Sequence, residues 1–163
     1  MPPLDFARLY AAYSTDVFRF ALYLTGNRAE AEDIPSETFV RALAGRDVIR
    51  VATVKAYLLM IARNLHVDWK RRESRRATLP GDPPDLAPSP EAMSGAKSAL
   101  RAATSALQQL PEIDRAAILM RAVHDRSYDD IAKALGLTVA AARVKVHRAR
   151  LKLTAVCEGA DQT

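Results

Sequence analysis

Basic side chains crowd one short stretch near the end of the chain, RVKVHRARLK. They are Arg143, Lys145, Arg148, Arg150 and Lys152, with His147 among them and no acidic residue in between. Arginine and lysine bind DNA phosphates, and arginine can also donate two hydrogen bonds to a guanine edge. This density of positive charge therefore indicates a surface that contacts a polyanion.

The residues before and within this stretch follow the pattern of a helix-turn-helix. An apolar stripe at helical spacing is followed by Gly136, where a helix end favours a left-handed residue, and by Thr138, which can cap the next helix. The first stripe is Tyr128, Ile131, Ala132 and Leu135, and the second is Val139, Ala142, Val146, Ala149 and Leu153. Two helices joined by so short a turn, the second of them basic, are typical of DNA-binding proteins.

The opposite side of the second helix combines small and basic residues. It presents Ala140, Ala141, Val144, His147, Arg148 and Leu151, with Arg143, Lys145 and Lys152 at its edges. A major groove is about 12 Å wide and admits such a helix, with Val144 placed to touch a thymine methyl group. A solvated basic helix is the plain alternative. A helix lying on a membrane is disfavoured because the apolar side lacks Trp and Phe.

The composition sets broad limits. The chain has 163 residues, a formal charge of +5 and 49% hydrophobic residues, which suits one ordinary domain or two small helical ones. Cys157 is the single cysteine, so no disulfide can form within the chain, and it can be incidental or a redox sensor. We expect a cytoplasmic protein, because no signal peptide or membrane-spanning run is present.

A proline-rich stretch divides the chain. Residues 77–95 hold five of the nine prolines and three acidic residues but no basic one. Proline blocks helix propagation, so we predict a flexible acidic linker here, between a domain at 1–76 and another at 96–163. Each domain carries a net charge of +4.

Helical periodicity dominates both predicted domains, so we predict an all-α fold. The first helix should bury Phe6, Leu9, Tyr10, Tyr13, Val17, Phe20, Ala21 and Leu24 and end at Gly26. Asn27 with Glu30 resembles a capping box. Pro35 either kinks a helix or lies in the first turn of a new one, and we favour the second. Further helices are predicted at about 53–76, 97–109 and 113–123, the first of them ending in a basic cluster.

The chain as a whole resembles the extracytoplasmic-function sigma factors, which give bacterial RNA polymerase its promoter specificity. In the first domain the matching segments are LYAAYSTDVFRFALYLTGNRAEAEDIPSETFVRAL and AYLLMIARNLHVDWKRR, and in the second the segment is LPEIDRAAILMRAVHDRSYDDIAKALGLTVAAARVKVHRARLKL. Together they cover most of residues 4–153. The resemblance implies binding to core RNA polymerase, through its clamp coiled coil and flap, to promoter DNA and to an anti-sigma factor.

The resemblance also implies roles for individual residues. The first domain looks like region 2, in which Asp33, Ser36, Glu37 and Phe39 match the segment that binds the clamp; Phe39 is also a candidate core residue. The match to the −10 recognition segment, which captures an extruded base, consists of Arg63, Asn64, Asp68, Trp69, Lys70, Arg71 and Arg72, with Trp69 equally a core candidate. The second domain looks like region 4, which reads the −35 element. There Arg121 approaches the DNA backbone, and Arg143, Val144, His147 and Arg148 face the groove.

Nothing in the sequence predicts catalysis or a cofactor. His66, His124 and His147 are far apart, and no metal-ligand spacing or phosphate-binding glycine loop is present. Two other functions fit the basic helix-turn-helix: a stand-alone regulator with an N-terminal dimerisation or effector domain, and an adaptor that binds acidic proteins. Symmetric half-sites in a footprint would indicate the regulator.

Overall fold

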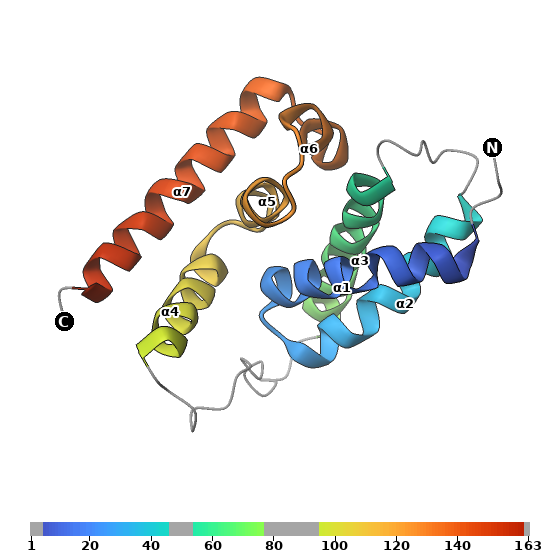
Figure 1. The fold of residues 1–163 in the computed structure, drawn as a ribbon, viewed down its shortest axis with the longest axis horizontal. Helices are drawn as coiled ribbons and strands as arrows, with labels where there is room; N and C mark the ends of the chain where they lie inside the picture. The colour runs from blue at the N-terminus through green and yellow to red at the C-terminus, as the bar shows by residue number, and fades with distance from the viewer. Residues whose placement is uncertain (1–4, 46–53, 77–94, 162–163) are drawn as a thin grey trace. The chain divides into compact units, whose positions relative to one another are not determined.

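The computed structural model describes residues 5–45, 54–76 and 95–161, with side chains described at 5–45, 54–76 and 101–159 (Figure 1). Those residues are helical apart from short turns, which confirms the predicted all-α class. None of the helices they form is both long and apolar enough to cross a membrane. The chain divides into an N-terminal unit, Met1–Asp85, and a C-terminal unit, Leu86–Thr163. The predicted linker falls almost wholly outside the described residues, so the domain boundaries at 76 and 95 stay predictions.

The N-terminal unit is a bundle of three helices, α1 (Phe6–Thr25), α2 (Arg28–Ala44) and α3 (Val54–Arg76), in which each helix packs against the other two (Figure 1). Its core consists of fully buried apolar side chains from all three. The largest are Val17, Phe20, Leu24, Ile34, Phe39, Leu58, Leu59 and Leu65. A stripe of apolar residues repeated at three- and four-residue steps forms one buried helix face, which is why these helices associate.

The first turns of α1 differ from the prediction of one continuous buried face. Phe6 is 43% exposed and Tyr10 41% exposed, and Tyr13 is half-buried. Both exposed rings pack on Phe39 of α2, with ring centroids 6.4 Å and 5.1 Å away, and they stack on each other. The apolar stripe of α1 extends into the first turns of the helix. There Phe6 and Tyr10 pack on the Phe39 ring, and the outer side of each of these two rings stays in solvent.

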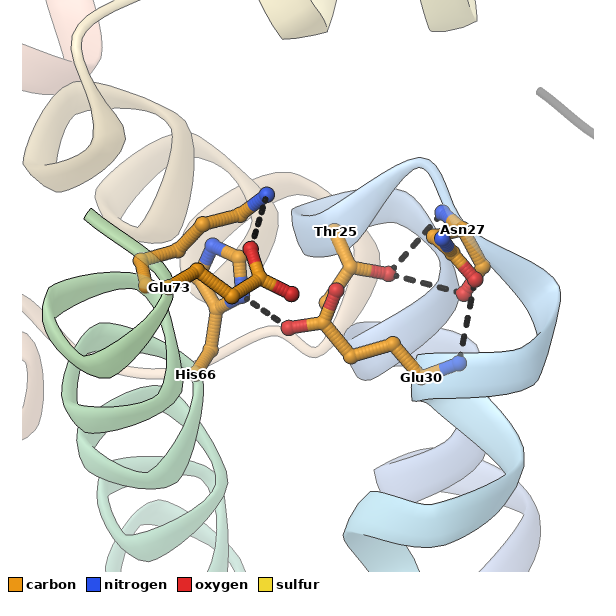
Figure 2. Close-up of polar contacts among 6 residues, drawn as sticks. Thr25, Asn27, Glu30, His66 and Glu73 are labelled. Carbon is orange, nitrogen blue, oxygen red and sulfur yellow. Dashed lines mark hydrogen bonds and ion pairs between the residues drawn. The ribbon is translucent and has the colours of Figure 1, made fainter. Parts of the chain in front are cut away.

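The turn between α1 and α2 is built as predicted at its backbone. Gly26 has a φ of 67°, the left-handed conformation that glycine adopts without strain. Asn27 Oδ1 accepts a hydrogen bond from the Glu30 amide, 3.1 Å away, and so caps α2. The reciprocal half of the capping box is absent: the Asn27 amide donates to Thr25 Oγ1 instead (Figure 2). The Glu30 carboxylate is thereby left for another partner.

Pro35 lies inside α2, so its predicted place in the first turn of a new helix is wrong. The helix begins at Arg28 and runs through the proline to Ala44. Pro35 has no N–H to donate to the carbonyl of Ala31, a defect that costs about 3 kcal/mol in a helix interior. Burial of the flanking Ile34, Thr38 and Phe39 against the bundle holds the helix together despite that defect.

The C-terminal unit packs three helical segments against one long helix. These are α4 (Gly95–Gln109), α5 (Glu112–Ile118) with its π-helical continuation η4 (Leu119–Val123), and α6 (Tyr128–Leu135); each of α4, α5 and α6 contacts α7 (Val139–Asp161) (Figure 1). The predicted helix at 113–123 therefore exists, but it widens to a π turn in its second half.

A buried arginine closes the junction between α4 and α5. Arg115 Nε donates to the Leu107 carbonyl at 2.8 Å, and its Nη2 donates to the Leu110 carbonyl at 3.0 Å. Carbonyls at a helix end have few partners within the helix, so these bonds help to satisfy the end of α4, where the Leu107 carbonyl also accepts from the Leu110 amide at 3.1 Å. Burial lowers the pKa of Arg115, and nearby Glu112 partly offsets this. The guanidinium nevertheless stays charged at ordinary pH.

Candidate nucleic-acid interface

The helix-turn-helix consists of α6, a short turn and α7. Ser127 Oγ accepts from the Asp130 amide at the start of α6, and Gly136, with a φ of 65°, ends that helix. Thr138 Oγ1 accepts from the Ala141 amide at 3.0 Å and caps α7. The capping roles predicted for Gly136 and Thr138 are confirmed. Because Gly136 fixes the end of α6 and Thr138 fixes the start of α7, local interactions set the direction in which α7 leaves the turn.

The buried and exposed sides of α7 follow the prediction in the middle of the helix, whereas Val139 and Leu153, at the ends of the predicted apolar stripe, are half-buried. Ala142, Val146 and Ala149 are buried against the rest of the unit. The residues predicted to face the groove are all exposed; they are Arg143, Val144, His147 and Arg148. Val144 is 46% exposed, a high value for an apolar residue in the middle of a helix. An exposed apolar side chain bordered by cations suits a surface that contacts base methyl groups and phosphates.

Lys145 is the basic residue of α7 that turns inward. Its Nζ lies 3.3 Å from Asp114 Oδ1 of α5, and both side chains are largely buried. Lys145 therefore holds α7 on α5 and is not available to a phosphate. The sequence contained no local signal for this pairing, because the two residues are 31 positions apart.

Arg121 and Arg143 meet at an aromatic ring. The Arg121 guanidinium carbon lies 4.5 Å from the centroid of the Tyr128 ring, and that of Arg143 lies 5.3 Å from it. Tyr128 was predicted as part of the buried stripe of α6, whereas it is only half-buried. The structure thus brings two of the predicted DNA-contacting residues together through a third residue that the sequence pattern had placed in the core.

The predicted −10 segment lies on α3 and is not gathered on one surface. Trp69 and Arg72 line an open hollow of about 450 Å³ between α3 and the start of α2, together with Asp33 and Asn27. Asn64 and Arg71 are exposed, Arg63 and Asp68 are half-buried, and Lys70 pairs with Glu73 at 3.6 Å. Trp69 is half-buried, so it serves both as part of the unit's interior and as a wall of the hollow.

A buried polar pair joins α2 to α3 beside this hollow. His66 Nδ1 lies 2.9 Å from Glu30 Oε1, which joins α3 to the first turn of α2 (Figure 2). The His66 side chain is 3% exposed and that of Glu30 13%. Sequence reasoning missed this contact. The available signal in the sequence was the position of His66, four residues after Ala62 on a side of the helix that is otherwise apolar.

The predicted polymerase-binding residues lie on α2 with different exposures. Asp33 and Ser36 are exposed, and Glu37 is half-exposed with its carboxylate 3.2 Å from Arg41 Nε. Phe39 has no exposed surface, so here it supports α2 from within. Direct contact between Phe39 and a partner would require Phe6 and Tyr10 to move off its ring.

Comparison with known families matches both units. Residues 9–76 match the Sigma-70 region 2 family, and residues 100–153 match the Sigma-70 region 4 family. These two ranges contain every residue predicted to contact DNA or polymerase.

Two curated relatives and one solved structure cover most of the chain. The ECF RNA polymerase sigma factor SigL of Mycobacterium tuberculosis is 33% identical over 159 residues, covering 90% of this chain and 86% of SigL. SigE of Mycolicibacterium smegmatis is 32% identical, covering 94% of this chain and 61% of SigE. The sigma factor RpoE of Bartonella quintana, solved with the anti-sigma factor NepR, matches the fold with a TM-score of 0.79 at 24% identity, covering 94% of this chain and 97% of RpoE.

Proposed function

Because this chain belongs to the ECF family of RNA polymerase sigma factors, we propose that it binds core RNA polymerase and directs it to promoters with a −35 and a −10 element. One observation carries this proposal: the chain holds a region 2 unit and a region 4 unit, and the second ends in a helix-turn-helix with a basic outer face. A sigma factor needs both parts, since each recognises a different DNA element.

For region 4, we assign the −35 element to α7. Arg143, His147 and Arg148 are exposed on the side of α7 away from the packed face, and Arg121 shares the Tyr128 ring with Arg143. Exposed arginines on a recognition helix can donate to guanine O6 and N7 or to phosphates. Lys145 is excluded from this set by its pairing with Asp114.

For region 2, we assign the −10 element to the second half of α3. The hollow beside Trp69 has an aromatic wall, and its lining holds Arg72 and Arg76 as well as the carboxylates of Glu30, Asp33 and Glu73. The Trp69 ring can stack an unpaired base, and the Arg72 guanidinium can contact its phosphate. The other members of this assignment are Arg63, Asn64, Asp68, Lys70 and Arg71. Core polymerase is assigned to α2, through Asp33, Ser36 and Glu37, with Phe39 as support from within.

We also propose that an anti-sigma factor controls the chain, since the related RpoE was solved with one. The protein would act in the cytoplasm, where the polymerase is, and contribute no catalytic group of its own. Any bond-forming chemistry in the complex then belongs to the polymerase.

Run-off transcription with purified bacterial core polymerase tests the proposal. Templates from a broad library of bacterial upstream sequences would be transcribed with core alone and with core plus this chain. We expect specific transcripts only in the second reaction, from templates that share two unlike elements at a fixed separation. Identical transcripts in both reactions would refute the sigma-factor function. Symmetric half-sites in the bound DNA would instead indicate a stand-alone helix-turn-helix regulator.

A further inference from the structure

Tyr128, the first residue of the helix-turn-helix, has an aromatic ring that two cationic side chains contact. Two guanidinium groups lie against its ring, from η4 and from α7, at 4.5 Å and 5.3 Å from the centroid. Both distances are within the roughly 6 Å range at which an aromatic ring attracts a cation. One ring thus holds two side chains of like charge, an arrangement in which the two cations repel each other unless an anion joins them.

Arg121 is fixed to this ring from a second direction. Its Nη1 donates to the Arg126 carbonyl at 3.1 Å, and Arg126 in turn donates to the His124 carbonyl at 2.9 Å. The loop that these bonds span includes Asp125, whose φ is 52°. Arg121 also belongs to the π turn η4, in which the His124 amide bonds to the Leu119 carbonyl. A π turn inserts one extra residue, so it changes the direction of the side chains that follow, and such turns occur often at functional sites.

The position of the ring in the motif identifies the anion. Tyr128 begins α6, and Arg143 lies in the second turn of α7. In helix-turn-helix proteins the first helix crosses the DNA backbone while the start of the second enters the major groove. In that docking geometry, a pair of arginines at this junction would face the sugar–phosphate chain at the edge of the groove. Arginine binds phosphate through two parallel hydrogen bonds when its planar group is held in a fixed orientation.

We propose that Tyr128 is a positioning residue that holds Arg121 and Arg143 as a coupled pair for the DNA backbone at the edge of the −35 element. This inference rests on the proposed function. It also changes the role of Arg143, which becomes a phosphate-binding residue, while Arg148 and His147 remain the candidates for base contact. Removing the ring should weaken both arginine contacts at once, although neither arginine is changed.

The test compares Tyr128→Phe, which keeps the aromatic ring, with Tyr128→Leu, which removes it. Binding of the polymerase holoenzyme to a duplex carrying a promoter selected by the wild type would be measured across a potassium chloride series. Each phosphate contact contributes about 0.9 to the slope of log affinity against log salt. We expect Tyr128→Leu to lower the slope by about 1 to 2 and the affinity by roughly 5- to 20-fold, and Tyr128→Phe to stay within about 2-fold of wild type.

The energetic coupling between Tyr128 and Arg143 distinguishes a positioning role of Tyr128 from a purely structural one. Arg143→Ala should reduce affinity about 10-fold in the wild type but only about 2-fold in the Tyr128→Leu background, because its contact is already weakened. Misfolding would lower the active fraction without altering the salt slope. An unchanged slope with additive losses, or equal losses for Phe and Leu, would overturn the positioning role while the sigma-factor function stands. A wild-type holoenzyme that selects no promoter would overturn both.

Discussion

Arg148 is the α7 residue whose loss should separate DNA recognition from polymerase binding. It is exposed, and it lies on the side of the helix opposite Ala142, Val146 and Ala149. A lost bidentate base contact costs about 1–3 kcal/mol. We therefore expect Arg148→Ala to reduce promoter-specific run-off transcription about 10-fold or more, with core polymerase co-purifying as before.

The control for Arg148→Ala is a variant that removes the same charge elsewhere. Arg28→Ala does so on α2, where Arg28 forms an exposed pair with Glu32 that contributes little stability. Normal transcription with this variant would show that net charge is not the cause. Equal loss of transcription and of core binding in Arg148→Ala would indicate misfolding and would remove the assignment of Arg148.

A corresponding prediction concerns Glu37, on the surface of α2 that we propose binds core polymerase. Its carboxylate is half-exposed and pairs with Arg41 on the same helix. Reversing the charge places a lysine beside Arg41 and a like charge against any basic contact on the partner, which costs several kcal/mol at an interface. We expect Glu37→Lys to reduce co-purification of core polymerase at least 10-fold.

Glu32→Lys is the matched control for Glu37→Lys. It reverses the same charge on the same helix and breaks an equivalent pair four residues apart, with Arg28. Core binding that survives Glu32→Lys and fails with Glu37→Lys would locate the contact on one side of α2. If Glu37→Lys protein co-purified with core at the wild-type level, the polymerase assignment of this segment would be wrong.

At the scale of elements, Pro35 leaves a defect inside α2 that substitution can repair. Alanine restores the missing N–H, which recovers about 3 kcal/mol, and loses two buried methylene groups at about 0.8 kcal/mol each. We expect Pro35→Ala to stabilise the N-terminal unit by about 1 kcal/mol. Trp69 is the single tryptophan of the chain and lies in this unit, so its fluorescence during urea unfolding reports the change. A lower midpoint would show that packing of the proline ring outweighs the lost hydrogen bond.

The junction of α4 and α5 gives the complementary test in the C-terminal unit. Methionine at position 115 keeps the length of the side chain but removes the Arg115 donor from the Leu110 carbonyl and one of the two donors, Arg115 and the Leu110 amide, from the Leu107 carbonyl. We expect Arg115→Met to destabilise this unit by about 2–4 kcal/mol. Circular dichroism should show a transition at lower urea, while the Trp69 transition stays in place. If both transitions moved together, the two units would not unfold independently.

Helix ends were predictable from the sequence because their signals are local. Gly26 and Gly136 adopt the left-handed conformation expected after a helical stripe, and Asn27 and Thr138 cap the helices that follow. The continuous α2 was not predictable, because the helical preference of its residues opposes Pro35 and only burial in the bundle decides the outcome. Local rules fail where packing between helices dominates.

In the candidate site, too, local signals were predictable and contacts between helices were not. Periodicity was enough to place Val144, His147 and Arg148 on the exposed side of α7. It gave no means of separating Lys145 from the basic residues around it, because the deciding partner, Asp114, belongs to another helix. Tyr128 fell on an apolar stripe, and its contact with two arginines depends on the π turn that orients Arg121. Contacts between distant residues set these roles.

At the scale of the whole molecule, the two units divide one recognition task. The exposed cations proposed to meet DNA lie at the end of α3 in one unit and on the outer side of α7 in the other. Holding both units on one polymerase turns the second DNA contact into an intramolecular event, which can raise the apparent affinity about 10²- to 10⁴-fold. Neither unit then needs to bind its element tightly by itself, and the free chain should discriminate poorly between promoter and unrelated DNA.

This division predicts a large difference between the free chain and the holoenzyme. Fluorescence anisotropy with a labelled promoter duplex at physiological salt should show binding by the chain alone at least about 100-fold weaker than by the chain on core polymerase. At low salt the free chain should bind with a steep salt dependence and little preference for sequence, because phosphate contacts would then supply its affinity. Tight and specific binding by the free chain would contradict this, since recognition would no longer need the polymerase to hold the two units, and a stand-alone regulator would explain the result better.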